Sequence, residues 1–293
     1  MSPMARRAGA VSKTTVNRPG DWFRVTRVAE GLFAIEERPH VQSYLVSGDL
    51  RSALIDTGMG FADIRAAVAP LARGDVIVLN THWHFDHVGG NARFDERGIS
   101  PLETRLVERG WSNAELMTLY AGSCLSDDFP LPEGFVVEEY EIAGTRPTFE
   151  LRDGDFIDLG GRVLEAIATP GHTHGSTSFL DPKSRSLLCG DLVDRGTLFA
   201  NFEDSDIGEY ADSLAKVHRR CGEFDFVLPS HNRFPLANDF VGRVRNAFDE
   251  IRERLARGES GGWGGSSMRR FVFDEFAVLA KRPGASGMRL RSG

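Results

Sequence analysis

The chain has 293 residues, of which 41% are hydrophobic, enough for a sizeable core. Its net charge of −7, from 42 acidic and 35 basic residues, disfavours non-specific binding to the phosphates of nucleic acid. No apolar run approaches the roughly 18 residues that a membrane-spanning helix requires. The N-terminal residues lack the apolar core of a secretory signal. We therefore expect a globular cytoplasmic protein that neither binds nucleic acid nor crosses a membrane.

The three cysteines are widely spaced, odd in number and form no CxxC motif. They are Cys124, Cys189 and Cys221. This usage is typical of a reduced compartment without a disulfide framework. We expect three buried or half-buried thiols without a chemical role.

Predicted elements follow one another along the chain after a mobile tail at residues 1–20. Hydrophobic patterns predict strands at 23–29, 32–37, 42–47, 53–55, 76–79, 148–152, 155–158, 162–168, 176–180, 185–189, 226–228 and 271–279. They predict helices at 61–73, twice within 101–122, at 206–221 with Ser205 as N-cap, and at 237–257.

Two segments carry weak periodicity. Residues 123–147 predict a long surface excursion, which in an enzyme often binds substrate. Residues 259–293 predict a flexible Gly/Ser segment and a last strand of the same domain, whose pairing within or between chains stays open. No linker divides residues 21–258, so we expect one domain, and strand-rich stretches followed twice by helices indicate two sheets with helices outside.

One short stretch concentrates metal-binding chemistry. His82, His84, Asp86 and His87 lie within six residues and are followed by Gly89, which allows a sharp turn. Imidazole and carboxylate are ligands for zinc, iron or manganese. In an extended loop alternate side chains share a face, so His82 and His84 can hold one ion while Asp86 and His87 face a second position.

Three more candidate ligands each follow a predicted strand directly. They are His172 in a TPGH turn, Asp191 in a GD pair and His231 in a PSH turn. Together with His82, these residues give four cases in which a candidate ligand stands just past the carboxyl end of an apolar strand. Loops held by a rigid sheet are where catalytic groups belong, so the arrangement predicts a single site.

These motifs resemble the metallo-β-lactamase superfamily over roughly residues 25–235. The resemblance implies an α/β fold, a four-layer αββα sandwich of two mixed sheets with helices outside. It implies that His82, His84 and His172 bind a first metal ion, that Asp86, His87 and His231 bind a second, and that Asp191 bridges both. Asp56, in an IDTG turn, would support a ligand histidine by a hydrogen bond.

The resemblance also implies the chemistry. Two divalent cations, zinc in preference to iron or manganese, would convert a bridging water into the hydroxide that attacks an acyl bond. Asp86 would orient that hydroxide and pass its proton to the leaving group.

Some positions depart from the superfamily's usual patterns. His174 stands where proline is common, and Ser176 where several branches carry another histidine. Asp194 stands where acyl-homoserine lactonases usually carry tyrosine. His174 and Asp194 are candidate substrate contacts, whereas His40 and His218 are expected to be ordinary histidines.

The nearest similarity within the superfamily is to its acyl-CoA thioesterase-like branch, followed by the glyoxalase II-like branch. It rests on the stretch from Phe33 to Tyr44, on the Leu151-Arg-Asp-Gly-Asp segment and on the residues after Gly190. The implied substrate is a small acyl molecule, a thioester such as acyl-CoA. The alternatives are a lactone or ester hydrolase, for example one of natural-product biosynthesis, and a hydroxyacylglutathione hydrolase. A β-lactamase and a non-catalytic binding protein are less favoured, and the oligomeric state stays open.

Overall fold

Seventeen strands and six α-helices are present in the residues that the computed structural model of the chain describes, which are 14–15, 22–37, 41–120, 131–257 and 268–281. The strands are β1 (Thr14–Thr15), β2 (Phe23–Ala29), β3 (Leu32–Glu37), β4 (Val41–Ser47), β5 (Ser52–Ile55), β6 (Val76–Leu79), β7 (Glu96–Ile99), β8 (Phe149–Glu150), β9 (Phe156–Asp158), β10 (Val163–Ala168), β11 (Thr177–Asp181), β12 (Ser186–Gly190), β13 (Thr197–Ala200), β14 (Phe226–Pro229), β15 (Leu236–Ala237), β16 (Met268–Val272) and β17 (Ala277–Lys281). The helices are α1 (Ile64–Val68), α2 (Phe85–Val88), α3 (Thr104–Arg109), α4 (Asn113–Tyr120), α5 (Ile207–Arg219) and α6 (Asp239–Ala256).

Two mixed sheets form the centre of the molecule. The first runs in the order β1 to β8, antiparallel as far as β5 and parallel from β5 onward. The second runs β15-β14-β12-β11-β10-β9, with one parallel pairing between β12 and β14. The expected α/β class with two mixed sheets is confirmed.

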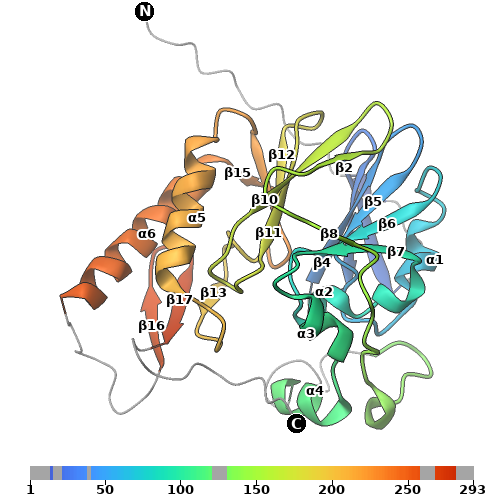
Figure 1. Ribbon diagram of the computed structural model, residues 1–293, viewed down its shortest axis with the longest axis horizontal. Helices are drawn as coiled ribbons and strands as arrows, with labels where there is room; N and C mark the ends of the chain where they lie inside the picture. Colours follow the sequence, from blue (N-terminus) through green and yellow to red (C-terminus); the bar gives the residue numbers. More distant parts are fainter. Residues whose placement is uncertain (1–13, 16–21, 38–40, 121–130, 258–267, 282–293) are drawn as a thin grey trace, which may run out of the picture.

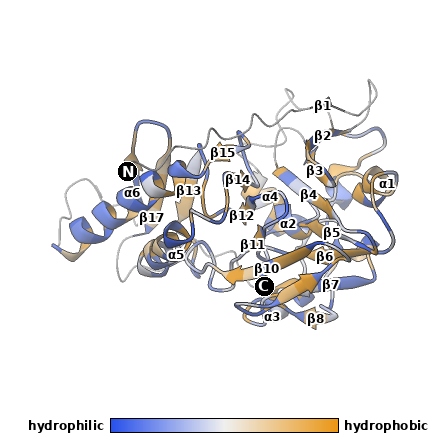
Figure 2. Ribbon diagram, turned by 90° about the horizontal axis from the view of Figure 1, so that it is seen from above, coloured by the Kyte–Doolittle hydropathy of each residue, from blue (hydrophilic) through white to orange (hydrophobic). Residues whose placement is uncertain are grey.

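The layers follow from which faces are apolar. Buried side chains of β3 to β6 meet those of β10, β11, β12 and β14 between the sheets, for example Tyr44 and Leu79 with Phe179 and Leu228. Helix α1 covers the outer face of the first sheet, and α5 with α6 covers that of the second. Figure 1 shows α5 and α6 on one side of the molecule and the first sheet on the other. In Figure 2, α6 carries many polar residues, whereas β6 and β10 are mostly apolar.

A third sheet, unexpected from the sequence, lies beside α5 and α6. It has the order β13-β17-β16, and β17 pairs in parallel with β13, so that Thr197 lies opposite Ala277. The last predicted strand therefore pairs within the chain. It is also wrong as a single strand, because residues 273–276 turn the chain into a β16–β17 hairpin in which the Phe273 N–H donates to the Phe276 carbonyl.

Two helix predictions need correction. The helix expected at 61–73 spans only Ile64–Val68, because Asp63 caps its start and Pro70 cannot donate a backbone hydrogen bond. The N-cap of α5 is Asp206, whose side chain accepts from the Glu209 N–H, and not Ser205. Ser205 makes a different contact, described below.

Several expectations fall on residues that the structure describes only in part. Of the predicted tail, Thr14 and Thr15 pair with β2. The predicted excursion at 123–147 is described from residue 131 onward. In this part Ile142 pairs with Trp111, and the Tyr140 hydroxyl donates to the Met59 carbonyl. Cys124 and His40 lie outside the described residues. Cys189 and Cys221 are free thiols, and no helix in the described parts of the chain has the length and hydropathy to cross a membrane.

Candidate metal centre

The histidine-rich motif lies where the first sheet ends. The chain leaves β6 at Leu79, and His84 caps the short helix α2 that carries Asp86 and His87. The Asn80 side chain and the Thr57 N–H both donate to the His87 carbonyl, at 3.1 and 2.8 Å. Hydrogen bonds to the backbone carbonyl of His87 thus hold the motif against the loops that follow β5 and β6.

The remaining candidate ligands come from the second sheet. His172 follows β10, Asp191 follows β12 and His231 follows β14. The structure brings all seven predicted ligands together in three overlapping groups, each with donor atoms within 4.8 Å of one another. The groups are His82, His84 and His172; His82, His87 and Asp191; and Asp86, His87 and His231.

Three imidazoles converge in the first group. His84 Nδ1 lies 3.1 Å from His82 Nε2 and 3.0 Å from His172 Nε2. Burial and neighbouring imidazoles lower the pKa of His82 and His84 well below the ordinary value. Both rings are therefore neutral at pH 7, the form in which histidine binds a metal.

Carboxylates surround the second group. His231 Nε2 lies 3.4 Å from Asp86 Oδ2, and His87 Nε2 lies 3.7 Å from Asp86 Oδ1. Asp191 faces both groups: its Oδ2 is 3.4 Å from His172 Nε2, and its Oδ1 is 3.4 Å from His87 Nε2. One carboxylate thus reaches the imidazoles of both groups with its two oxygens.

The donor set leaves polar atoms without partners. His87 Nε2 and Asp191 Oδ1 are buried and have no hydrogen-bond partner among the described residues. Burying such atoms costs free energy unless something binds them. Imidazole nitrogen and carboxylate oxygen are ligands of divalent transition metals, so the residues present fit a divalent metal centre.

Asp56 lies directly behind the motif. Its Oδ2 is 2.7 Å from His87 Nδ1 and also accepts from the Thr81 hydroxyl, while its Oδ1 accepts from the Thr81 N–H. An acceptor at Nδ1 fixes the tautomer that leaves Nε2 open toward the centre. Asp56 adopts a φ of 59°, a conformation that few non-glycine residues adopt.

A backbone carbonyl plays the same part for His172. Its Nδ1 lies 2.8 Å from the Phe199 carbonyl on β13, so that Nε2 faces the first group. The hydroxyl of Ser205 donates to the His172 carbonyl at 2.7 Å. The contact with Phe199 could not be predicted because β13 is a strand of four residues without a strong pattern, and Ser205 was expected to be a helix N-cap.

The two candidate substrate contacts lie in different surroundings. Asp194 is buried and lines the cavity next to the cluster. Burial raises the pKa of Asp194, although His231 and Asn232 oppose the shift. His174 is exposed, lies 3.1 Å from Glu209 and is not among the residues that line the cavity.

A cavity of about 580 Å³ opens over the cluster. Its wall combines the ligand side chains with apolar residues that the sequence did not single out, namely Phe85, Leu119, Leu198, Phe199 and Phe202. A short apolar stretch just after a ligand aspartate is the signal that could have indicated 198–202. No residue of 131–147 lines this cavity, so the described part of the predicted excursion lies outside it.

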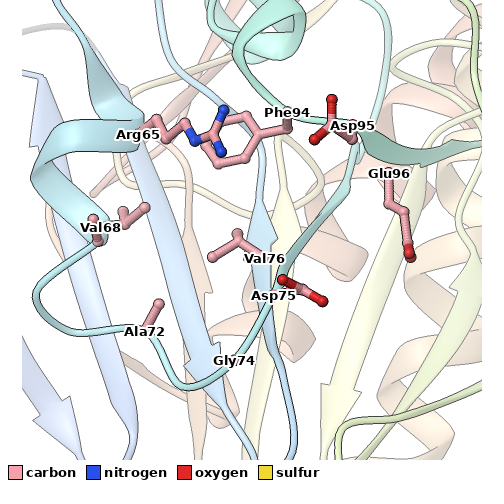
Figure 3. A pocket seen from close by; sticks show the side chains of 10 residues that line it. Arg65, Val68, Ala72, Gly74, Asp75, Val76, Phe94, Asp95 and Glu96 are labelled. Carbon is pink, nitrogen blue, oxygen red and sulfur yellow. The ribbon is translucent and has the colours of Figure 1, made fainter.

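A second hollow lies on the outer face of the first sheet, between α1 and the start of β6 (Figure 3). It is lined by mixed side chains, among them Arg65, Val68, Asp75, Phe94 and Glu96. Arg65 donates to the Arg93 carbonyl at 2.9 Å. No residue of the candidate metal-binding cluster lines this hollow.

Two packed mixed sheets that deliver five imidazoles and two carboxylates to one edge define a metallo-hydrolase. The chain belongs to the metallo-β-lactamase superfamily, whose family model matches residues 38–219. It is therefore an enzyme of the metal-dependent hydrolase class.

Curated relatives extend the similarity beyond the family model. The chain is 29% identical over 250 residues to the acyl-coenzyme A thioesterase MBLAC2 of Homo sapiens, covering 76% of this chain and 88% of the relative. It is 30% identical over 247 residues to the protein of that name from Gallus gallus, with the same coverage. A hydroxyacylglutathione hydrolase of Francisella tularensis is 34% identical over 88 residues, 30% of this chain and 34% of the relative.

Solved structures share the fold. A sec-alkylsulfatase from Pseudomonas superposes with a TM-score of 0.65 at 16% identity, over 81% of this chain and 43% of that one. A metallo-beta-lactamase family protein of Thermus thermophilus superposes with a TM-score of 0.57 at 18% identity, over 87% and 100% of the two chains. At such identity these structures support the fold alone.

Proposed function

We propose that this enzyme hydrolyses acyl thioesters, with acyl-CoA as the favoured substrate, at a centre of two divalent metal ions. One observation carries the proposal: the cavity joins the ligand cluster to an apolar wall, so a reacting carbonyl and an alkyl chain fit side by side. The relatives named acyl-coenzyme A thioesterase, similar over most of the chain, support it.

The proposed ligand sets follow the two groups of converging donors. His82, His84 and His172 would hold the first ion, and Asp86, His87 and His231 the second. Asp191 would serve both, because its two oxygens face opposite groups. Zinc suits a set dominated by imidazole, and iron or manganese are the alternatives. When bound, the ions supply Lewis acidity toward the carbonyl and toward water.

Asp86 is the proposed proton carrier. Its side chain is 17% exposed and lines the cavity, whereas the adjacent His87 is fully buried. Water adds its oxygen to the acyl carbon and gives a proton to the Asp86 carboxylate. The carbon–sulfur bond then breaks, and Asp86 returns the proton to the departing thiolate. The products are a carboxylic acid and a thiol, so atoms and charges balance.

The apolar wall is proposed to hold the acyl chain. This wall lies next to His84 and His172 and consists of Leu119, Leu198, Phe199 and Phe202. Leu198 is buried, Leu119 and Phe202 are half-buried, and Phe199 is 39% exposed. Covering the alkyl chain there removes apolar area from water at about 25 cal/mol per Å². Longer acyl chains should therefore bind more tightly, up to the length that the cavity admits.

A substrate panel tests the proposal. Metal-loaded enzyme is incubated with acyl-CoA thioesters of increasing chain length, an acyl-glutathione and a set of lactones, and thiol or acid release is measured. We expect turnover of the acyl-CoA esters, with KM falling as the chain lengthens. Cleavage of lactones without any thioester turnover would contradict the proposal, and preference for acyl-glutathione would favour the hydroxyacylglutathione hydrolase alternative.

The proton carrier is tested by substitution. Asp86→Ala should lower kcat at least about a hundredfold, since general acid–base catalysis typically contributes 10²–10⁴-fold. His174→Ala, a histidine outside the cavity, is the matched control and should stay within about threefold. Metal content is measured for both variants, and a fully active Asp86→Ala enzyme would exclude the assigned role.

A further inference from the structure

Residues 199–206, here called the positioning segment, grip the loop that carries His172. The Phe199 carbonyl faces His172 Nδ1 at 2.8 Å, and the Ser205 hydroxyl donates to the His172 carbonyl at 2.7 Å. The Asp206 N–H donates to the Gly171 carbonyl at 2.9 Å. Three separate contacts thus fix both the ring and the backbone of one proposed ligand.

The same segment also contacts the loop that carries His84. The ring centroid of Phe202 lies 4.6 Å from that of His84 and 5.6 Å from that of His172. Asp204 accepts a hydrogen bond from the Trp83 indole N–H at 3.1 Å. Two proposed ligands from different sheets are therefore held by one stretch of chain.

The C-terminal strand anchors this segment. Strand β17 pairs in parallel with β13, which runs directly into the segment (Figure 1). At the end of β17 the Lys281 ammonium donates to the carbonyls of Phe202 and Glu203, at 3.1 and 2.8 Å. Hydrogen bonds from a charged donor are stronger than neutral ones, so Lys281 fixes the turn that presents the Phe202 ring.

We propose that Lys281 is a positioning residue, which through the positioning segment fixes the imidazoles of His84 and His172 and sets the apolar wall formed by Phe199 and Phe202. One remote cation would then govern both metal retention and acyl-group selectivity. The part about acyl groups rests on the proposed thioesterase function. The part about the metal ligands stands on the contacts alone.

Metal retention tests the first part without any substrate. Lys281→Met keeps the length of the side chain and removes the donor. We expect loss of metal to a competing chelator, followed with a coloured indicator, to be about tenfold faster, because changing groups that orient metal ligands typically weakens metal binding 10- to 100-fold. Lys183→Met is the matched control, since Lys183 also donates to a backbone carbonyl, that of Gly161, but far from the cluster. It should match the wild type.

Two further variants separate positioning from general stability. Lys281→Arg keeps a cationic donor and should restore most of the retention at an unchanged melting temperature. Ser205→Ala removes the hydrogen bond to the His172 carbonyl while leaving β17 intact, and should also speed metal loss. Wild-type metal retention in Lys281→Met would overturn the proposal, whatever the result for Ser205→Ala.

Kinetics across acyl-chain lengths test the second part. In Lys281→Met we expect KM for long-chain acyl-CoA to rise at least about fivefold more than KM for a short-chain ester, because the wall formed by Phe199 and Phe202 is displaced. An equal change for all lengths would overturn the selectivity claim. If the wild type turned over no thioester, the proposed function would fail while the retention result would still decide the metal part.

Discussion

Glu37 is a buried carboxyl that accepts hydrogen bonds from uncharged donors. It is 1% exposed, and it accepts hydrogen bonds from the Trp22 indole at 3.0 Å and the Met59 N–H at 2.7 Å. Burial raises its pKa to about 7, although these hydrogen bonds oppose the shift. It supports the turn at 57–60, which follows Asp56 and packs against the metal-binding motif.

This pKa predicts a pH dependence of stability. Between pH 4.5 and 7 the unfolded chain loses the Glu37 proton while the folded chain keeps it, so the free energy of unfolding falls as pH rises through that window. The full effect above pH 7 is about 3 kcal/mol. Glu37→Gln should remove this part of the slope in urea titrations at pH 5, 6, 7 and 8. Glu30→Gln, at an exposed position, should retain it, and identical slopes in all three proteins would exclude the effect.

At the scale of single residues, the candidate metal ligands could be picked out from the sequence because histidine is a rare residue with distinctive chemistry. The candidate ligands His82, His84 and His87 stand within one motif, and the structure places His172 and His231 beside them. The supporting groups could not be read in the same way. The Phe199 carbonyl is a backbone atom that any residue would supply. The position of Ser205 before a helix predicted an N-cap, whereas its hydroxyl donates to the His172 carbonyl.

Among the elements, the two central sheets are joined at one end by a buried ion pair. Arg162, just before β10, pairs with Asp181 at the end of β11, and both side chains are almost wholly buried. The same guanidinium donates to the carbonyls of Gly31 and Ser47, at 3.0 and 3.2 Å. It therefore fastens the second sheet to the turns of the first.

Breaking this pair should be costly. Asp181→Ala leaves a buried guanidinium without its counter-charge, which typically costs about 3–5 kcal/mol. The control is Asp225→Ala, which breaks the exposed pair with Arg185 and should cost less than about 1 kcal/mol. Chemical denaturation of both variants measures the difference. Equal losses would show that Arg162 finds compensation elsewhere.

Predictions of strands and helices succeeded where the segment itself was strongly apolar. They failed where pairing or a turn, and not the hydrophobic pattern, decides the structure. Strands β6 and β14, buried in the sheets, were predicted within one residue of their ends. Strand β7 was not predicted, because its sequence Glu-Arg-Gly-Ile has no strand pattern and its pairing with neighbouring strands makes it a strand. The predicted strand at 271–279 is split by the turn at 273–276, in which Glu275 pairs with Arg195 and Arg243.

At the scale of the whole molecule, the candidate metal ligands come from both central sheets. Four follow β6 in the first sheet and three follow β10, β12 and β14 in the second. A bound cation would thus cross-link the halves of the core. Without one, His87 Nε2 and Asp191 Oδ1 are buried and have no hydrogen-bond partner in the described part of the chain.

Metal removal should therefore destabilise the protein. A ligand at a thousand times its Kd stabilises by about 4 kcal/mol, which corresponds to a melting temperature about 8 °C or more higher. Thermal unfolding is compared for untreated protein, protein with a chelator, and protein with chelator already saturated with zinc. The melting temperature should fall only with the free chelator and recover when metal is returned. An unchanged melting temperature would argue against metal as a structural cross-link.

The parallel pairing of β13 with β17 has a consequence for how the enzyme is made. Synthesis proceeds from the N-terminus, and Ala277 follows its partner Thr197 by the whole of α5, β14, β15 and α6. Contacts between such distant residues form late in folding. If β17 and Lys281 fix the loop bearing His172 as proposed, a nascent chain that has not yet docked the β16–β17 hairpin would carry an incomplete centre, and metal capture would follow the docking of that hairpin.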